Sequence, residues 1–181
     1  MLKKRLEKGL IQVYTGDGKG KTTAALGQAL RAVGAGYRVY MVQFLKGGST
    51  GELEAAKRLE PEFRIFRFEK ERGFFWTLSD SEKKELKSEV NEAFEFIREV
   101  VRGEKCNILI LDEVMGILHN GLLTVDEVCN LLEQKPDKME IILTGRDVPE
   151  KIKEMAHLVT EMRLVKHPFD RGIGSREGIE W

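Results

Sequence analysis

The sequence has few cysteines and no excess of charge of either sign. Cys106 and Cys129 are the two cysteines among 181 residues, so a disulfide framework is excluded and reduced thiols are expected. The 30 basic and 30 acidic residues cancel, so no overall field attracts nucleic acid or an anionic membrane. Long apolar runs are also missing, and residues 1–9 (MLKKRLEKG) fit neither a signal peptide nor a membrane anchor. We therefore expect a cytoplasmic protein that binds neither nucleic acid nor membranes.

Apolar patterning alternates between strands and helices along most of the chain. Strands are expected at residues 10–14, 38–44, 63–68, 107–111, 140–144 and 158–164. Helices are expected at residues 21–33, 52–59, 79–102, 114–119, 124–134 and 149–156. The central strands are uniformly apolar, as in a parallel sheet that is covered on both faces. The pattern predicts a three-layer α/β fold with a mostly parallel sheet of about six strands.

Local signals refine this outline. Residues 63–68 (FRIFRF) alternate strictly, which indicates a half-covered or edge strand. Ser79 and Glu82 have the spacing of a capping box at the start of the longest helix. No linker or internal repeat interrupts the pattern, so we expect an N-terminal extension at residues 1–9 and a single domain at residues 10–181.

The stretch at residues 10–25 (LIQVYTGDGKGKTTAA) has the order of a phosphate-binding loop. A β-prone run leads into a glycine-rich turn, then Lys21, Thr22 and a helix-forming segment. Glycines let backbone N–H groups converge on a phosphate, and the helix adds its N-terminal partial charge. Lys21 would supply a point charge, and the Thr22 hydroxyl could reach Mg²⁺. The residues expected at the nucleotide are Gly16, Asp17, Gly18, Lys19, Gly20, Lys21, Thr22 and Thr23.

The turn departs from the usual pattern G-x-x-x-x-G-K-[ST]. That pattern would place its first glycine at position 15, which is Thr15, whereas the glycine is Gly16 and the loop is one residue short. A glycine-rich turn by itself can also be a hairpin or the end of a helix, so the loop has to be weighed with the rest of the site.

Several expected strands end in polar residues, and ligands collect at the carboxyl ends of parallel strands. These residues are Gln43 with Lys46, Asp112 with Glu113, and Gly145 with Arg146. Asp112 and Glu113 are expected to bind Mg²⁺ together with Thr22, although an Asp-Glu pair after a strand can also be a helix cap. Arg146 is either a surface residue or a ligand of the triphosphate. Gln43 is expected to contact the nucleotide.

Three consecutive aromatic residues, Phe74, Phe75 and Trp76, follow Gly73 in an expected loop. They could pack a lid onto the core, or they could form a flat apolar wall for a large planar ligand. The sequence leaves both interpretations open.

These motifs, in this order, resemble the P-loop type of ATP:corrinoid adenosyltransferase. The resemblance covers nearly the whole chain from Gly9 and implies a P-loop domain of the RecA-like type. An LDE or a TGR motif alone is common, whereas the short P-loop, the aromatic loop and the tail together are highly specific. The motifs are TGDGKGKTTAALG at residues 15–27, VQFLKG at 42–47, GFFW at 73–76, LDEV at 111–114, TGR at 144–146 and KHPFDRGIGSREGIEW at 166–181.

The resemblance implies that Co(I) of a reduced corrinoid attacks the ribose 5′-carbon of Mg·ATP and releases triphosphate, with ATP bound in reverse. Lys21 and Arg146 would stabilise the leaving triphosphate, while Phe74 and Trp76 would lie under the corrin ring. The implied metal is Mg²⁺ or Mn²⁺, held by Thr22, Asp112 and Glu113. A corrinoid substrate, an electron-transfer partner such as a reduced flavoprotein, and a homodimer are implied as partners. Phe75 stands where a small polar residue is usual.

Two rival functions use the same residues. A P-loop ATPase or small-molecule kinase is suggested by Glu113, because hydrolytic P-loop proteins keep a water-activating carboxylate at this position. A non-catalytic, nucleotide-gated corrinoid carrier would bind both ligands without making a product. The ATPase or kinase has no use for Phe74 and Trp76.

Overall fold

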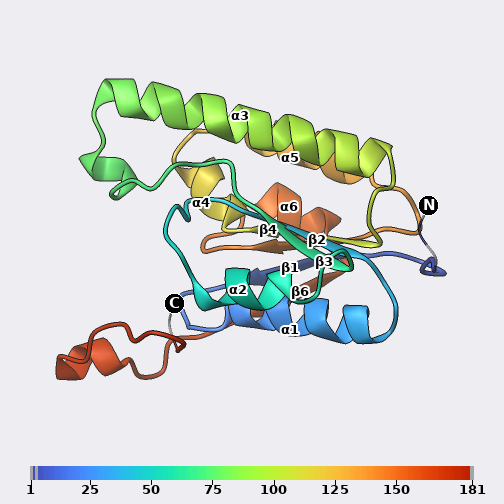
Figure 1. Cartoon of the computed structure of the whole chain (residues 1–181). Helices are drawn as coiled ribbons and strands as arrows, with labels where there is room; N and C mark the ends of the chain where they lie inside the picture. The colour runs from blue at the N-terminus through green and yellow to red at the C-terminus, as the bar shows by residue number, and fades with distance from the viewer. Residues whose placement is uncertain (1, 3, 180–181) are drawn as a thin grey trace.

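Six parallel strands form the central sheet of the computed structural model, which describes residues 2 and 4–179 (Figure 1). The strand order is β3-β2-β4-β5-β1-β6, and every neighbouring pair is parallel. The predicted mostly parallel sheet is therefore confirmed. The strands are β1 (Ile11–Thr15), β2 (Val39–Gln43), β3 (Phe63–Phe66), β4 (Ile108–Asp112), β5 (Glu140–Thr144) and β6 (Leu158–Glu161).

Helices cover both faces of the sheet and complete the three layers (Figure 1). Successive residues of a strand point to opposite faces, so Leu109 and Leu111 of β4 join one core and Ile108 and Ile110 join the other. The first core packs against α3 and α5, and the second packs against α1 and α2. The helices are α1 (Lys21–Gly34), α2 (Gly51–Lys57), α3 (Asp80–Arg102), α4 (Val114–His119), α5 (Val125–Glu133) and α6 (Glu150–Met155), with 3₁₀ turns η1 (Phe75–Thr77) and η2 (Pro168–Arg171).

The two edge strands are the shortest and differ in length from the prediction. β3 lies at one edge, as its alternation predicts, but ends at Phe66 because the chain then turns toward the site. β6 lies at the other edge and ends at Glu161, three residues before the predicted end at 164. The next residue, Met162, donates its N–H to the carbonyl of Thr15 and accepts from the N–H of Gly18, so the chain leaves the sheet to cover the glycine loop.

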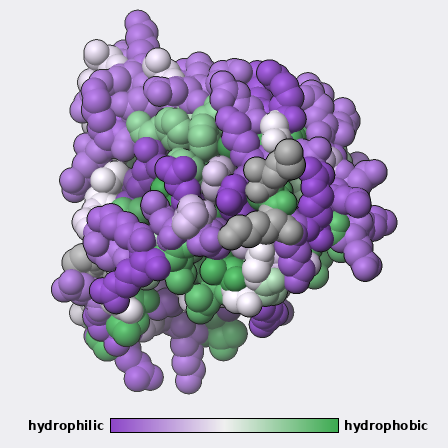
Figure 2. Space-filling model, turned by 45° about the vertical axis from the view of Figure 1, so that its right-hand side comes forward, coloured by the Kyte–Doolittle hydropathy of each residue, from purple (hydrophilic) through white to green (hydrophobic). Residues whose placement is uncertain are grey.

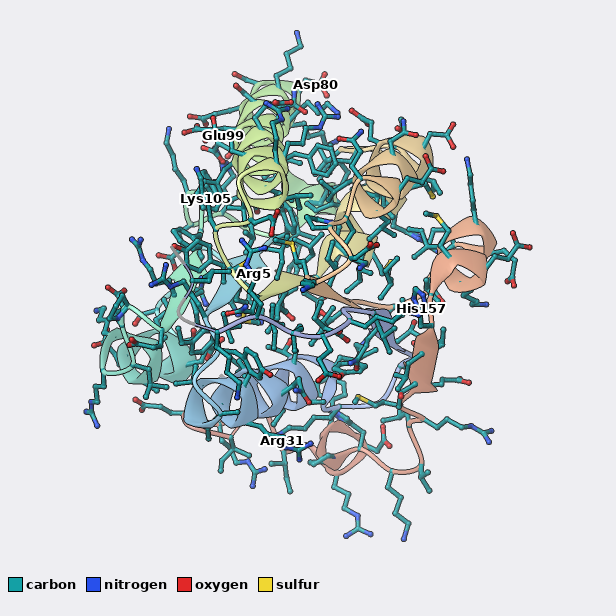
Figure 3. The ribbon with its side chains drawn as sticks, turned by 90° about the vertical axis from the view of Figure 1, so that its right-hand side faces the viewer. Arg5, Arg31, Asp80, Glu99, Lys105 and His157 are labelled. Carbon is teal, nitrogen blue, oxygen red and sulfur yellow. The ribbon has the colours of Figure 1, made fainter. Side chains whose placement is uncertain are left out.

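The N-terminal segment and the residue before β6 contact the central fold. Lys4 Nζ donates to the carbonyl of Ala35, and Asn107 Nδ2 donates to the carbonyl of Lys4. His157, labelled in Figure 3, accepts the N–H of Ile11 through Nδ1 at 3.1 Å. The division into an extension and one domain stays a prediction. Glu180 and Trp181, the last residues of the tail motif, lie outside the described residues.

Charged residues lie mainly on the surface. Figure 2 shows one face on which hydrophilic residues predominate and apolar residues gather in smaller patches. Among the described residues, no helix combines the length and apolar character that crossing a bilayer would require.

The predicted capping box of α3 is confirmed and gives a stability prediction. The N–H of Glu82 donates to Ser79 Oγ at 3.3 Å, and the N–H of Ser79 donates to Glu82 Oε2 at 2.8 Å. Ser79→Ala removes an N-cap acceptor and should cost about 1 kcal/mol, which lowers the melting temperature by roughly 2–4 °C in a chain of this size. Thermal unfolding followed by circular dichroism measures this change.

Ser81→Ala is the matched control, because Ser81 is an exposed residue inside the same first turn. It should leave the melting temperature unchanged or slightly higher. An equal loss in both variants would mean that the capping box does not stabilise α3.

Candidate active site

The glycine loop joins β1 to α1 as the phosphate-loop prediction requires, and it is not a hairpin. Gly16 and Gly20 have φ angles of 96° and 118°, in the left-handed region that favours glycine. A Cβ on Gly18 would lie 2.7 Å from the carbonyl oxygen of Met162. The shortened loop therefore depends on glycine both for its backbone angles and for the close approach of the chain after β6.

Lys21 is folded back over this loop. Its side chain is buried, and Nζ donates to the carbonyls of Gly16 at 2.6 Å and Gly18 at 2.9 Å. Burial lowers the pKa of Lys21. The positive charge of Arg146 lowers this pKa further, whereas the negative charge of Glu113 raises it. A positive charge is thus held at the N-terminus of a 14-residue helix that has no acidic residue in its first turn. Both features favour an anion at this point.

Asp112 at the end of β4 is fully buried and is the meeting point of several elements. Oδ1 accepts from Thr22 Oγ1 at 2.8 Å and from Thr144 Oγ1 at 2.7 Å. Oδ2 accepts from Lys46 Nζ at 2.8 Å and from Gln43 Nε2 at 3.1 Å. The alternative of a helix cap is wrong for Asp112, because the N-cap residue of α4 is Glu113.

Sheet register explains why these residues meet. Gln43 pairs directly with Asp112 across β2 and β4, and Leu111 pairs with Leu143, so Thr144 follows one step along β5. The carboxyl ends of three adjacent strands therefore present their last side chains side by side. Thr22 reaches the same point from the start of α1.

Glu113 is half-buried and has a φ of 60°, which is uncommon for a residue other than glycine. Its N–H donates to Thr144 Oγ1 at 2.9 Å, and its side chain makes no cap hydrogen bond. Burial raises the pKa of Glu113. The negative charge of Asp112 raises this pKa further, whereas the positive charges of Lys46, Lys21 and Arg146 lower it. The carboxyl group of Glu113 therefore interacts electrostatically with Asp112 and with the nearby lysines and Arg146, and it does not cap α4.

The remaining predicted nucleotide residues lie at the open side of the loop. Asp17, Lys19 and Thr23 are exposed. Arg146 is also exposed, and its Nε lies 4.0 Å from Asp17 Oδ1. Lys19 Nζ donates to the carbonyl of Ile179 at 2.6 Å, so the tail approaches the loop as well. The structure thus brings Arg146 to the mouth of the loop.

The aromatic segment divides between the two interpretations that the sequence left open. Phe75 packs against the main core, as a lid residue would. Phe74 and Trp76 are 69% and 76% exposed and stack on each other with ring centroids 4.7 Å apart and an interplanar angle of 4°. The stacked pair presents a flat apolar surface to solvent.

A cavity of about 280 Å³ lies beside the stacked pair, and Leu45, Gly47 and Glu69 contribute to its wall. Glu69 Oε2 accepts the N–H of Leu45 at 2.8 Å, while Oε1 is buried and has no hydrogen-bond partner among the described residues. Burial raises the pKa of Glu69 to about 7, and Glu89 adds to the rise. This group could not be anticipated, because a single glutamate in the charged run EKER is typical of a solvated turn.

Arg67 was also missed by sequence reasoning, although it orients a predicted site residue. Its Nε donates to Gln43 Oε1 at 2.8 Å, and Nη2 donates to Thr50 Oγ1 at 2.7 Å. Glu52 Oε1 lies 3.6 Å from the same guanidinium. Gln43 is therefore fixed with its amide nitrogen toward Asp112.

The residues at Asp112 fit a hard divalent cation. Two carboxylates and a hydroxyl are the oxygen donors that Mg²⁺ and Mn²⁺ prefer, and substrate phosphates usually complete such a site. Within the described part of the chain no group of three or more His, Cys, Asp or Glu side chains is arranged to hold a metal. Thr22, Asp112 and Glu113 carry oxygen atoms of the kind that such a cation binds.

A strand, a short glycine loop ending in Lys-Thr, and a buried aspartate on a nearby strand define a P-loop nucleotide-binding fold. Flagellar accessory protein FlaH from Methanocaldococcus jannaschii shares this fold, with a TM-score of 0.59 at 15% identity over 86% of this chain and 72% of that chain.

Sequence comparison identifies the family within that class. The model of "ATP:corrinoid adenosyltransferase BtuR/CobO/CobP" matches residues 7–181. The corrinoid adenosyltransferase of Sinorhizobium sp. is 39% identical over 100% of this chain and 84% of its own length. That of Escherichia coli K12 is 36% identical over 97% and 87%. The chain belongs to the ATP:corrinoid adenosyltransferase family, whose members are transferases.

The buried carboxyl of Glu69, whose Oε1 has no hydrogen-bond partner among the described residues, gives a pH-dependent prediction. Because the folded-state pKa is raised from 4.5 to about 7, the native state binds the proton more tightly, and stability is lost as pH rises through this window. Glu69→Gln should therefore raise the melting temperature at pH 8, by roughly 2–4 °C for each kcal/mol gained. The advantage should vanish near pH 4.5.

Differential scanning fluorimetry at several pH values tests this expectation. Glu71→Gln changes an exposed neighbour and is the matched control. A Glu69→Gln effect that is the same at pH 5 and pH 8 would contradict the expectation.

Proposed function

We propose that this protein transfers the 5′-deoxyadenosyl group of ATP to the Co(I) of a reduced corrinoid and releases triphosphate. One observation supports this most strongly: residues 45–47 join the two halves of the site. Lys46 contacts Asp112 at the glycine loop, while Leu45 and Gly47 line the cavity beside Phe74 and Trp76. A charged phosphate site and a flat apolar surface are thus neighbours, as a reaction between ATP and a large planar ring requires.

At the nucleotide end, the residues of the loop meet the charge that develops on the leaving group. The Co–C bond forms as the C5′–O bond breaks, and the electrons of that bond leave with the triphosphate. Lys21 and Arg146 would stabilise this charge, because fixed cations aimed at a developing anion lower the barrier. Mg²⁺ or Mn²⁺, held by Thr22, Asp112 and Glu113, would supply further positive charge at the phosphate oxygens. Cobalt is the nucleophile, so no side chain has to act as a general base.

At the corrinoid end, Phe74 and Trp76 would cover one face of the cobalt. An axial donor such as water raises the orbital that the incoming electron must enter, so its exclusion makes Co(II) easier to reduce. Each ~59 mV gained in a one-electron potential is about tenfold in equilibrium, or roughly 1.4 kcal/mol. The exposed, stacked rings are suited to this role because they offer apolar area and no ligand atom.

Three further features belong to the proposal. The electron would come from a partner such as a reduced flavoprotein. The protein would act as a homodimer in the cytoplasm. Gln43, fixed by Arg67, would help to orient Asp112 at the nucleotide.

The main rival is a P-loop ATPase or kinase that uses Glu113 as the catalytic carboxylate. Incubation with Mg·ATP and chemically reduced cobalamin should instead give adenosylcobalamin and triphosphate in equal amounts, measured by absorbance and by phosphorus NMR. ADP as the sole nucleotide product would reject the adenosyltransferase. Binding of both ligands without any product would favour the carrier.

Replacement of the stacked pair separates these functions further. Phe74→Ala combined with Trp76→Ala should lower adenosylation from Co(II) with a reductant by at least about tenfold for each 59 mV lost. ATP affinity should stay within about twofold, because the cavity that both rings line includes no residue of the glycine loop. Leu30→Ala, which also truncates an exposed apolar side chain, is the control. Unchanged adenosylation in the double variant would show that the rings have no part in the reaction.

A further inference from the structure

The ammonium group of Lys46 lies among three oxygen atoms, as a bound metal cation would. Its Nζ lies 2.8 Å from Asp112 Oδ2, 3.5 Å from Thr22 Oγ1 and 3.9 Å from Glu52 Oε1. Asp112 and Thr22 are two of the three residues proposed above to hold the divalent metal. The ammonium group therefore uses the same oxygen donors that the metal would use.

The buried carboxylate of Asp112 explains why a cation is present. A fully buried negative charge is costly unless it is paired and hydrogen-bonded. Thr22, Thr144 and Gln43 supply hydrogen bonds but no charge. Lys46 supplies the charge from a side chain that is still 24% exposed, so it has an open path toward solvent.

We propose that Lys46 is an exchangeable counter-cation for Asp112, which neutralises the carboxylate until the metal arrives with the ATP triphosphate. This inference rests on the proposed function, because it takes Thr22 and Asp112 as metal ligands. Two cations at one carboxylate oxygen repel each other, so a metal ion alone must compete with the built-in ammonium group. The triphosphate removes this competition, since it brings negative charge that attracts both cations.

The exchange would also affect the part of the site beside Phe74 and Trp76. Leu45, next to Lys46, has a left-handed φ of 55° and donates its N–H to Glu69. On the other side, a Cβ on Gly47 would lie 2.3 Å from Glu71 Cα, so the backbone is tightly packed there. Displacement of Lys46 would therefore shift residues 45–47, of which Leu45 and Gly47 line the cavity beside Phe74 and Trp76. Lys46 is in this sense a positioning residue that links metal entry to the shape of the second half of the site.

Binding of Mn²⁺ to the protein tests the proposal without turnover; it is followed by electron paramagnetic resonance of the free ion and corrected for the Mn²⁺ that ATP binds without protein. Wild-type protein should bind Mn²⁺ weakly alone and much more tightly with ATP. Lys46→Met should bind Mn²⁺ alone at least about tenfold more tightly than wild type, because one competing unit charge is gone. The enhancement by ATP should shrink accordingly. Lys57→Met removes an exposed lysine of α2 and should leave both affinities unchanged.

Lys46→Gln is the second variant, because it keeps a hydrogen-bond donor for Asp112 without the charge and should fold if Lys46→Met does not. Mn²⁺ should also raise the melting temperature of either uncharged variant more than that of wild type. Unchanged or weaker Mn²⁺ binding in the folded variant, with normal Mn²⁺ binding by wild type plus ATP, would overturn the exchange and leave the proposed function intact. Failure of wild type to bind Mn²⁺ even with ATP would overturn the metal site itself.

Discussion

The buried carboxylate of Asp112 is the constraint on which the rest of the site depends. A buried charge has to be paired and hydrogen-bonded, and here the partners are four residues from three parts of the chain: Thr22, Gln43 with Lys46, and Thr144. Each bond fixes the end of one element relative to the others. The same carboxylate that makes the interior costly therefore aligns α1, β2, β4 and β5 at one edge of the sheet.

The glycine loop depends in turn on a segment that is distant in sequence. The chain after β6 passes so close to the loop that a side chain on Gly16 or Gly18 would collide with Met162, and it accepts the N–H of Gly18. Among the described strands, β6 pairs only with β1, and its residues are exposed. Burial therefore contributes little to this edge strand, whose structural role is to bring Met162 to the glycine loop.

The sequence predicts those parts of this structure that follow from periodicity or from contiguous motifs. The strands, the layers, the capping box of α3 and the positions of Lys21 and Asp112 all belong to this kind, since burial of a sheet imposes a regular pattern. Arg67 and Glu69 do not, because their partners are set by loops whose contacts have no period. Lys46 was expected at this end of the sheet, but its ion pair with Asp112 was not. The split between Phe75 and its two neighbours was likewise undetermined, since three adjacent aromatics at the start of a 3₁₀ turn point in directions that only the packed structure fixes.

The two halves of the site satisfy opposite physical demands, and the fold keeps them apart by a short segment. Loss of triphosphate requires dense, ordered positive charge, which is stable only where a buried carboxylate balances it. In the proposed reaction, reduction of the corrinoid is favoured by the reverse, an apolar surface with no ligand atom. Phe74 and Trp76 are exposed while Phe75 packs their turn against the core. Residues 45–47 touch both regions, with Lys46 in the charged cluster and its neighbours at the cavity wall. In the proposed exchange, a change in the charge balance at Asp112 would reach the apolar half through residues 45–47, because Lys46 contacts Asp112 and its neighbours line the cavity.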